Sequence, residues 1–241
     1  MNEKSENSAL SSLLRRIKPY AKEIIFHSIA PNDANRWLFE LAFDTHWSAR
    51  EAYEWACRSL IATPLFLSKC AVYGEKISVD RVPYITACPR IELGSDIRVS
   101  GELQIKGNSK RSPVLKIGNG VFLGHWTTFA VAERIEIGNF VSIGGNTYIA
   151  DTEGHSHYNP QKPIWSVPAS DDDIEPVVIE DNVQISRNCM ILKGVRVGAR
   201  SVIGAGSVVR TSIPPDSIVM GNPARVVKRV TPTDSNNSKN T

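Results

Sequence analysis

Long hydrophobic runs, paired cysteines and a strong charge imbalance are all missing from this sequence of 241 residues. No apolar run reaches the roughly 18 residues that a membrane-spanning helix needs, and the first residues carry no signal-peptide pattern. The four cysteines form no CxxC pair, which argues against a disulfide framework and suits a reducing compartment. A net charge of +3 is too small to predict nucleic-acid binding by itself. We therefore expect a cytoplasmic globular protein that does not bind nucleic acid.

A period of six residues dominates the C-terminal part of the chain. A small or β-branched residue stands four places after each of the first five large aliphatic anchors, and the anchors are Ile179, Ile185, Ile191, Val197, Ile203 and Val209. A period of six is neither the two of a strand nor the 3.6 of a helix. It fits a solenoid, whose rungs each bury their anchor only by stacking on their neighbours. The repeat therefore predicts a mainly β solenoid.

The same period begins earlier, with interruptions. Counting nine earlier anchors gives fifteen rungs, or about five turns at three rungs a turn; these anchors are Ile91, Ile97, Leu103, Ile117, Leu123, Phe129, Ile137, Ile143 and Ile149. The step from Phe129 to Ile137 is eight, so two residues should bulge at a corner. The fourteen residues from Leu103 to Ile117 contain the basic run Lys106, Lys110 and Arg111, which we expect in a surface loop.

One interruption is much longer. The register breaks for 30 residues between Ile149 and Ile179 and then resumes. The segment contains DTEGHSHYNP (residues 151–160), Trp165 and the acidic run 171–173. Loops of this length without secondary structure are usually functional or disordered. Two histidines and a tryptophan favour function, so we predict an active-site loop over residues 151–176.

Residues 1–73 are predicted to form a helical extension, and residues 231–241 a disordered tail. Helical spacing recurs between Leu10 and Ile25, where basic side chains form one face. That face suits either an anionic membrane surface or, as we favour, plain solvation of a helix packed on the protein. A second helix is expected over 34–43 with Trp37, Leu38 and Leu41 inward. A third is expected after the capping-box pair Ser48 and Glu51, ending at Pro64.

The repeat region resembles the hexapeptide-repeat acyltransferases. The resemblance covers roughly residues 85–230 and rests on IGNGVFLG, VIEDNVQIS, ILKGVRVGARSVIGAGSVV and SIPPDSIVMGNPARVVKRV. The pairing of GAGSVV with GNPA is similar to the sugar O-acetyltransferase branch, which includes galactoside, maltose and polysaccharide acetyltransferases. The resemblance implies a left-handed parallel β-helix over residues 74–230, an exception to right-handed crossovers. It also implies a homotrimer with acetyl-CoA between neighbouring columns.

The chemistry of such a transfer needs a base with a pKa near neutrality, and histidine fits best. DTEGHS is similar to the family's DTDxHS pattern, which implies that His155 is the catalytic base. His157 is the competing candidate, and Asp151 or Glu153 is expected to fix the tautomer of the base. His125 stands on a regular rung, where we expect it to line the column surface or a trimer contact.

The resemblance also implies a coenzyme A site. Ala205 and Gly206 would let the pantetheine arm approach the backbone, and four cations would meet the phosphates or line the cleft: Arg187, Arg210, Arg225 and Lys228. For each cation the alternative is a solvated side chain. Two departures stand out: Gln184-Ile185-Ser186 replaces the family's Trp-Ile-Gly, and Arg210-Thr211 replaces the usual lysine after GAGSVVT. The first leaves the acceptor pocket in doubt.

The function predicted from these residues is direct O-acetyl transfer from acetyl-CoA to a hydroxyl of a sugar or surface-polysaccharide precursor, with no metal. The acceptor class stays open among nucleotide sugars, lipid-linked sugars and glycans. One alternative is a zinc enzyme like the γ-carbonic anhydrases, using His125, His155 and His157, although their HxxxxH pair is absent. Another is a β-helix that only scaffolds a complex.

Overall fold

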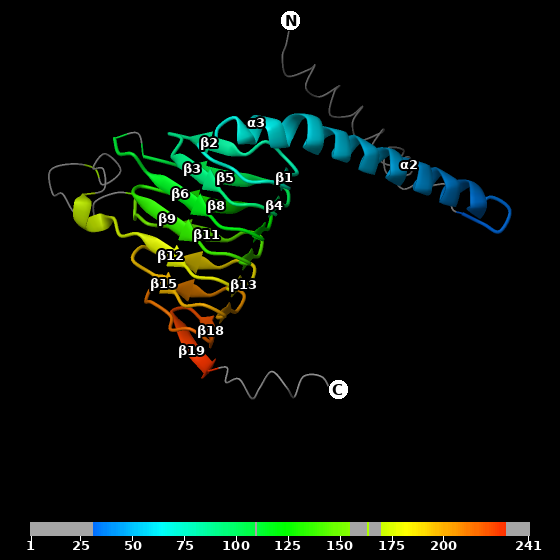
Figure 1. Cartoon of the computed structure of the whole chain (residues 1–241). Coiled ribbons are helices and arrows are strands. Elements are labelled where there is room, and N and C mark those ends of the chain that lie inside the picture. The colour runs from blue at the N-terminus through cyan, green and yellow to red at the C-terminus, as the bar shows by residue number, and fades with distance from the viewer. Residues whose placement is uncertain (1–30, 109, 155–162, 164–169, 230–241) are drawn as a thin grey trace, which may run out of the picture. The chain divides into compact units, whose positions relative to one another are not determined.

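The computed structural model describes residues 31–108, 110–154, 163 and 170–229 (Figure 1). Contacts divide the chain into two compact units, residues 1–51 and 52–241. None of the helices in the described ranges combines the length and the apolar character needed to cross a bilayer. The β-helix lies entirely in the second unit.

The two helices expected between residues 34 and 64 are not separate, because the chain is helical without a break from Arg36 onward. Helix α2 runs unbroken over Arg36–Cys57, and it is followed by a π-helix at Arg58–Ala62 and by α3 at Thr63–Leu67. The expected break near Ser48 is absent because residues 44–50 contain neither Gly nor Pro to interrupt the helix. Pro64 does not end a helix but stands in the first turn of α3, where its missing N–H costs nothing. The prediction that Trp37, Leu38 and Leu41 face inward was also wrong, because α2 buries none of its residues.

Nearly all strands belong to a parallel coil with three faces. Face I has eight strands: β1 (Ser78–Val79), β4 (Arg98–Val99), β7 (Phe122–Leu123), β10 (Ser142–Ile143), β13 (Gln184–Ile185), β16 (Val202–Ile203), β18 (Ser217–Gly221) and β19 (Ala224–Arg229). Face II has six: β2 (Tyr84–Thr86), β5 (Leu103–Lys106), β8 (Thr127–Ala130), β11 (Tyr148–Ala150), β14 (Met190–Ile191) and β17 (Val208–Val209). Face III has five: β3 (Arg90–Leu93), β6 (Val114–Ile117), β9 (Arg134–Ile137), β12 (Val177–Ile179) and β15 (Arg196–Val197).

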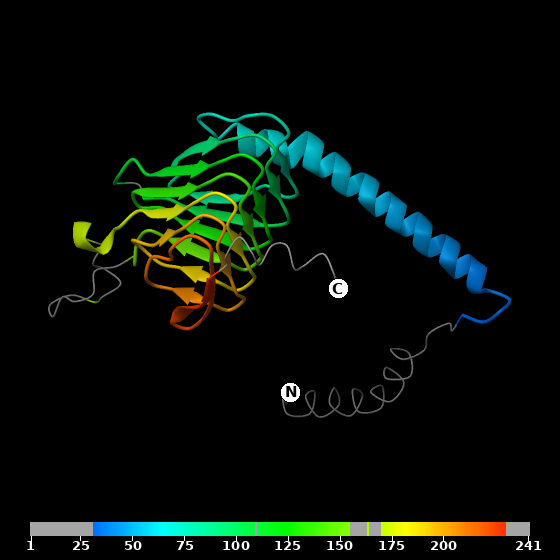
Figure 2. The ribbon, with the colours of Figure 1, turned by 60° about the horizontal axis from the view of Figure 1, so that its bottom comes forward.

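Strands β1 to β17 visit faces I, II and III in turn, so each face is built from every third strand, and β18 and β19 then both join face I (Figures 1 and 2). Every pairing between them is parallel except that of β18 with β19. This is the β-helix that the six-residue period predicts. We name its corners by the faces they join: I–II, II–III and III–I.

The interior is a set of stacked aliphatic rows. The anchors from Ile117 onward are in register, as in the row Ile117, Ile137, Ile179 and Val197 of face III. The small or β-branched residues four places after the later anchors are also buried. The earlier register was misassigned by two residues, since Leu93, not Ile91, pairs with Ile117. Both positions of a rung point inward and both are apolar here, so only the pairing distinguishes them.

Both ends of the stack are covered. Phe66 of α3 is buried in the same aliphatic cluster as the first turns. At the other end, β19 folds back antiparallel on β18, and Ala224 joins the cluster. Covering the ends matters because exposed strand edges invite pairing with other chains.

The predicted two-residue bulge between Phe129 and Ile137 is closed by a buried carboxylate. Asp151 is fully buried and accepts three backbone N–H bonds, from Ala132, Glu133 and Arg134, at 2.7, 2.8 and 2.6 Å. The extra residues thus have their backbone donors satisfied from the next turn of the coil. Burial raises the pKa of Asp151, and the three N–H bonds, which favour the carboxylate, act against that rise.

We predict that Asp151→Ala lowers the free energy of unfolding by about 3 kcal/mol, because a buried donor without a partner costs roughly 1–3 kcal/mol. Urea unfolding followed by circular dichroism measures the loss. Asp181→Ala is the matched control, since Asp181 also accepts a turn N–H, from Asn139, but is exposed, so water can replace it. Equal losses in the two variants would contradict the role given to burial.

Candidate functional site

Three of the residues predicted to bind coenzyme A share the I–II corner. Arg187 follows β13, and Ala205 and Gly206 follow β16 on the next turn. The N–H of Gly206 donates to the carbonyl of Arg187 at 3.0 Å, so the two turns are in direct contact. All three residues are exposed, and a side chain added at Gly206 would meet nothing within 4 Å. The corner is therefore open to a ligand at Gly206.

Arg225 lies at the same end of this corner. It stands in β19 opposite Met220, whose side chain in turn lies against Gly204. Its guanidinium Nη1 donates to the carbonyl of Ala224 at 2.8 Å, and the side chain is exposed. Lys228 follows on the same strand, opposite Ile218. The fold thus places the two cations after GNPA on the strand that extends face I beyond Gly206.

Arg210 is not part of that group. It follows β17 and lies at the II–III corner, across the width of face II from Arg187. The N–H of Leu192 donates to the carbonyl of Val209 at 3.0 Å, so Arg210 lies one turn beyond Lys193 along that corner. The predicted cofactor residues therefore divide between the two corners that bound face II.

The long insertion leaves the coil at this II–III corner, from Asp151. Its described ends, residues 151–154 and 170–175, form a neck joined by a bridge between Thr152 and Ile174. The N–H of Glu175 donates to the carbonyl of Asp151 at 2.9 Å. The 3-10 turn η3 (Asp171–Asp173) stands outside the stack of strands in both views (Figures 1 and 2). The insertion begins where the sequence predicted, directly after a face II strand.

Two cations that the sequence analysis did not assign to the site hold this neck. The Nζ atom of Lys193, a mostly buried side chain, lies 3.5 Å from a carboxylate oxygen of Glu153 and donates to the carbonyl of Asp172 at 3.2 Å. Arg111, from the basic surface loop, pairs with Asp171. No local sequence signal predicts these contacts, because the partners of Lys193 and Arg111 are distant in sequence.

His155 and His157 lie outside the described residues, as does Trp165. The pairing of either histidine with Asp151 or Glu153 thus stays a prediction. Both carboxylate oxygens of Asp151 already accept backbone N–H groups, which gives this residue a structural role whatever its catalytic one. Within the described ranges, no group of three or more His, Cys, Asp or Glu side chains is placed to hold a metal ion.

His125 lies on the I–II corner, two turns before Arg187, and is exposed there. Its imidazole meets the edge of the Trp126 indole, with ring centroids 5.9 Å apart and planes at 60°. The sequence analysis placed His125 on the column surface, and the exposure agrees with that placement.

The outward rows of faces II and III differ in charge. The outward row of face II, which the register pairs in order, is Tyr84, Gln104, Thr128, Tyr148, Met190 and Val208, with no charged member. The outward row of face III is Glu92, Lys116, Glu136, Val178 and Arg196. Charged rows are stable in water, whereas an uncharged row costs little to cover. Face II, between the two groups of predicted site residues, is thus the more easily buried.

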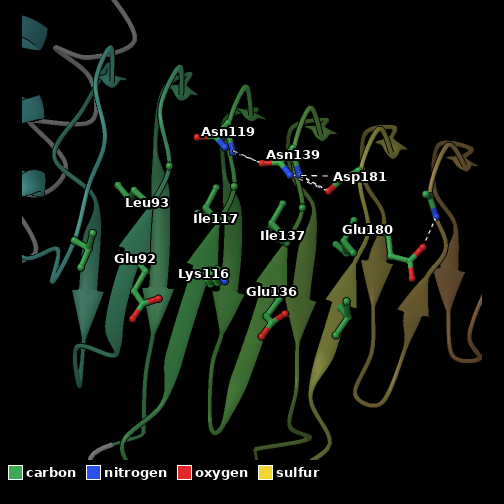
Figure 3. Close-up of a pocket in the computed structure, with 17 residues that line it drawn as sticks. Glu92, Leu93, Lys116, Ile117, Asn119, Glu136, Ile137, Asn139, Glu180 and Asp181 are labelled. Atoms are coloured by element: carbon green, nitrogen blue, oxygen red, sulfur yellow. Dashed lines mark hydrogen bonds between the residues drawn. The ribbon is translucent and has the colours of Figure 1, made fainter.

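A groove of about 690 Å³ lies elsewhere, on face III at the III–I corner (Figure 3). Its polar groups already have partners. Asn119 donates to Asn139, and Asn139 to Asp181, along the corner. Glu92, Glu136 and Glu180 each pair with an arginine. None of the predicted site residues lines it, so we place the candidate site at the corners of face II.

Comparisons with known proteins agree with the repeat. The family described as "Bacterial transferase hexapeptide (six repeats)" matches residues 176–211. A candidate acetyltransferase of Schizosaccharomyces pombe is 35% identical over 116 residues, which are 47% of this chain and 52% of that protein. The 2,3,4,5-tetrahydropyridine-2,6-dicarboxylate N-acetyltransferase of Brevibacillus brevis is 50% identical over 56 residues, 23% of this chain and 24% of the enzyme. The chain thus spans about half or less of these curated relatives.

A solved structure with the same fold is the N-acyltransferase AntD of Bacillus cereus, in complex with dTDP-4-amino-4,6-dideoxyglucose and coenzyme A. The TM-score is 0.58 at 19% identity, and the match covers 73% of this chain and 92% of that one. At this identity the likeness concerns the fold alone. Residues 176–211 thus match the bacterial transferase hexapeptide repeat, and they lie within the three-faced parallel coil.

Proposed function

We propose that this protein is an acetyl-CoA-dependent O-acetyltransferase whose acceptor is a hydroxyl of a sugar or of a surface-polysaccharide precursor. The observation that carries the proposal is the open turn at Gly206, with Arg187 on the adjacent turn and Arg225 on the strand beyond. Exposed arginines beside a bare backbone suit a ligand with phosphates and a narrow arm. Coenzyme A has both, and it is bound in the AntD structure of the same fold.

In this proposal the reaction is a direct transfer. His155 takes the proton from the acceptor hydroxyl while that oxygen attacks the thioester carbonyl, and the thiolate of coenzyme A leaves. Backbone N–H groups at a turn are the expected donors to the oxyanion. Lys193 ties both legs of the neck, at Glu153 and Asp172, to the turn after β14.

The division of the predicted residues supports a site shared between copies. Arg187 and Gly206 border one edge of face II, while Asp151 and Arg210 border the other. If the uncharged row of face II is covered by a second copy, a cleft forms along each edge, and residues from two copies meet there. We therefore propose a homotrimer, which is the smallest closed ring that such heterologous contacts can build.

A sugar acceptor is supported by the resemblance to sugar O-acetyltransferases and by the dTDP-sugar bound to AntD. A cytoplasmic location fits an enzyme that draws on acetyl-CoA. The zinc alternative rests on His155 and His157 together with His125, and a metal assay on the purified protein decides it. A purely scaffolding protein would fail to bind acetyl-CoA.

We predict that His155→Ala lowers kcat by about 10²–10⁴-fold, the usual value of general-base help, and leaves acetyl-CoA binding nearly unchanged. Steady-state kinetics and calorimetry measure the two effects. The wild-type rate should fall as pH drops through the histidine pKa, about 6.5 if unperturbed. His157→Ala is the matched control and should be milder. If only His157→Ala loses activity, His157 is the base in place of His155. If both variants remain active, the loop takes no part in the mechanism.

We predict that Arg225→Ala weakens acetyl-CoA binding by about tenfold, because charge-assisted hydrogen bonds to phosphate are worth roughly 1.5–3 kcal/mol and this one is partly screened. Calorimetric titration at two salt concentrations should show a smaller salt dependence than the wild type. Arg134→Ala, on face III and paired with Glu136, is the control and should bind normally. Unchanged affinity in Arg225→Ala would move the nucleotide site elsewhere.

We predict that Met190→Glu dissociates the trimer at micromolar concentration, because it places a charge in the middle of the uncharged row of face II. Light scattering reports the mass. Val178→Glu makes a similar change on face III, where charged side chains already stand, and should leave the trimer intact. A wild-type monomer would overturn the shared site, and an intact Met190→Glu trimer would place the contact on another face.

A further inference from the structure

Trp126 has an unusual place for a large apolar side chain. It stands on the I–II corner, three residues after the anchor Leu123, with its backbone at φ 57° and its side chain 57% exposed. The same position of the following turns is taken by Asn146, Asn188 and Gly206, at φ 57°, 60° and 72°. Asparagine and glycine tolerate this left-handed conformation, whereas a bulky residue is strained in it. Nothing in the packing of the coil requires an indole here.

The indole is nevertheless held in one orientation. Its Nε1 donates to the carboxylate of Glu102 at 3.0 Å, and the Trp126 backbone N–H donates to the Glu102 carbonyl at 2.6 Å. The edge contact with His125 supports its other side. His125 rests on Gly101, where any added side chain would lie 2.9 Å from its Nδ1 atom. The largely exposed indole thus has an imidazole and a carboxylate as neighbours.

This group lies on the same corner as the coenzyme A residues of the proposed function. Adjacent turns of a parallel sheet stand about 4.8 Å apart, so the Trp126 turn is roughly 10 Å from the Arg187 turn. The turn between them begins with Gly144 and Gly145, which carry no side chains. The side chain of Asn146, which donates to Asn188, is the largest that this corner turn places between a ligand on the indole and a cofactor bound at Arg187 and Gly206.

We propose that Trp126 is a stacking platform for a neutral pyranose ring, oriented by hydrogen bonds from its hydroxyls to Glu102. The negative face of an aromatic ring attracts the polarised C–H groups that line one side of a pyranose. A carboxylate accepts hydroxyl hydrogens but repels phosphate, which favours a sugar over the nucleotide part of an acceptor or cofactor. This inference rests on the proposed function, for which it names an acceptor subsite and a specificity-determining residue.

The neighbouring turns supply the test variant. Trp126→Asn installs the residue found at Asn146 and Asn188, so it removes the platform while relieving the backbone. Phe140→Asn is the matched control, because Phe140 has φ 56° and is 66% exposed, but it lies on the III–I corner. Both variants should melt at the wild-type temperature or above it, which separates binding effects from unfolding.

The experiment is ligand-observed saturation-transfer NMR on the full chain, with methyl β-galactopyranoside, methyl α-glucopyranoside and uridine as separate probes. We expect at least one pyranoside to receive saturation from the wild type and from Phe140→Asn. Trp126→Asn should weaken that binding by about three- to tenfold, the usual value of an aromatic contact. Glu102→Gln, which keeps an acceptor for the indole N–H, should retain most of it.

Each other result decides against the inference. Pyranoside binding that is equal in Trp126→Asn and wild type, or absent from the wild type, overturns it. Uridine binding that depends on Trp126 in place of pyranoside binding shows a nucleobase platform instead. If pyranosides bind at Trp126 but no acetyl group is transferred from acetyl-CoA, the proposed function fails and the sugar site stands. If transfer occurs with an acceptor KM unaffected by Trp126→Asn, the function stands and this subsite falls.

Discussion

Stacking of one turn on the next is the interaction on which the whole structure depends. A rung of two or three paired residues cannot bury its own anchor, and its backbone donors find partners only on neighbouring turns. The ladder along the I–II corner, where Asn146 donates to His125, Asn188 to Gly145 and Gly206 to Arg187, shows how continuous that contact is. A site built from successive turns inherits this rigidity, because each of its residues is fixed by the turn on either side.

Departures from the six-residue period therefore have to be accommodated, and this chain does so with side chains from elsewhere. The bulge at 132–134 places backbone donors where no strand can reach them, and Asp151 supplies the acceptors from the next turn. The same residue is the first of the long insertion. One buried carboxylate thus closes a bulge and anchors the start of the segment that contains the predicted base. Arg111 and Lys193 add ion pairs to the neck from two other turns.

The distribution of charge over the three faces bears on the site as much as any single residue does. Face III carries charged residues in a row and has a groove of about 690 Å³, yet the glutamates of that groove already pair with neighbouring arginines. Face II has an uncharged outward row, and the residues predicted to bind the cofactor or to act in catalysis border it on both sides. A groove is a poor guide to a functional site when its acidic side chains already form ion pairs. An uncharged row of side chains flanked by open turns and cations is a better guide to that site.

The sequence by itself determined the β-helix, because a strict period of six with apolar anchors has no other way to bury them. It also located the bulge and the long insertion, since these follow from counting along the period, whereas Ala205 and Gly206 were singled out by the resemblance of GAGSVV to the family motif. The tertiary structure alone decided the rest. Ile91 and Leu93 are equally apolar and both point inward, so only strand pairing sets the register. The separation of Arg210 from Arg187 depends on which face each turn follows. Lys193 and Asp151 meet partners about 20 residues away because the coil brings distant turns into contact, and no local pattern records those meetings.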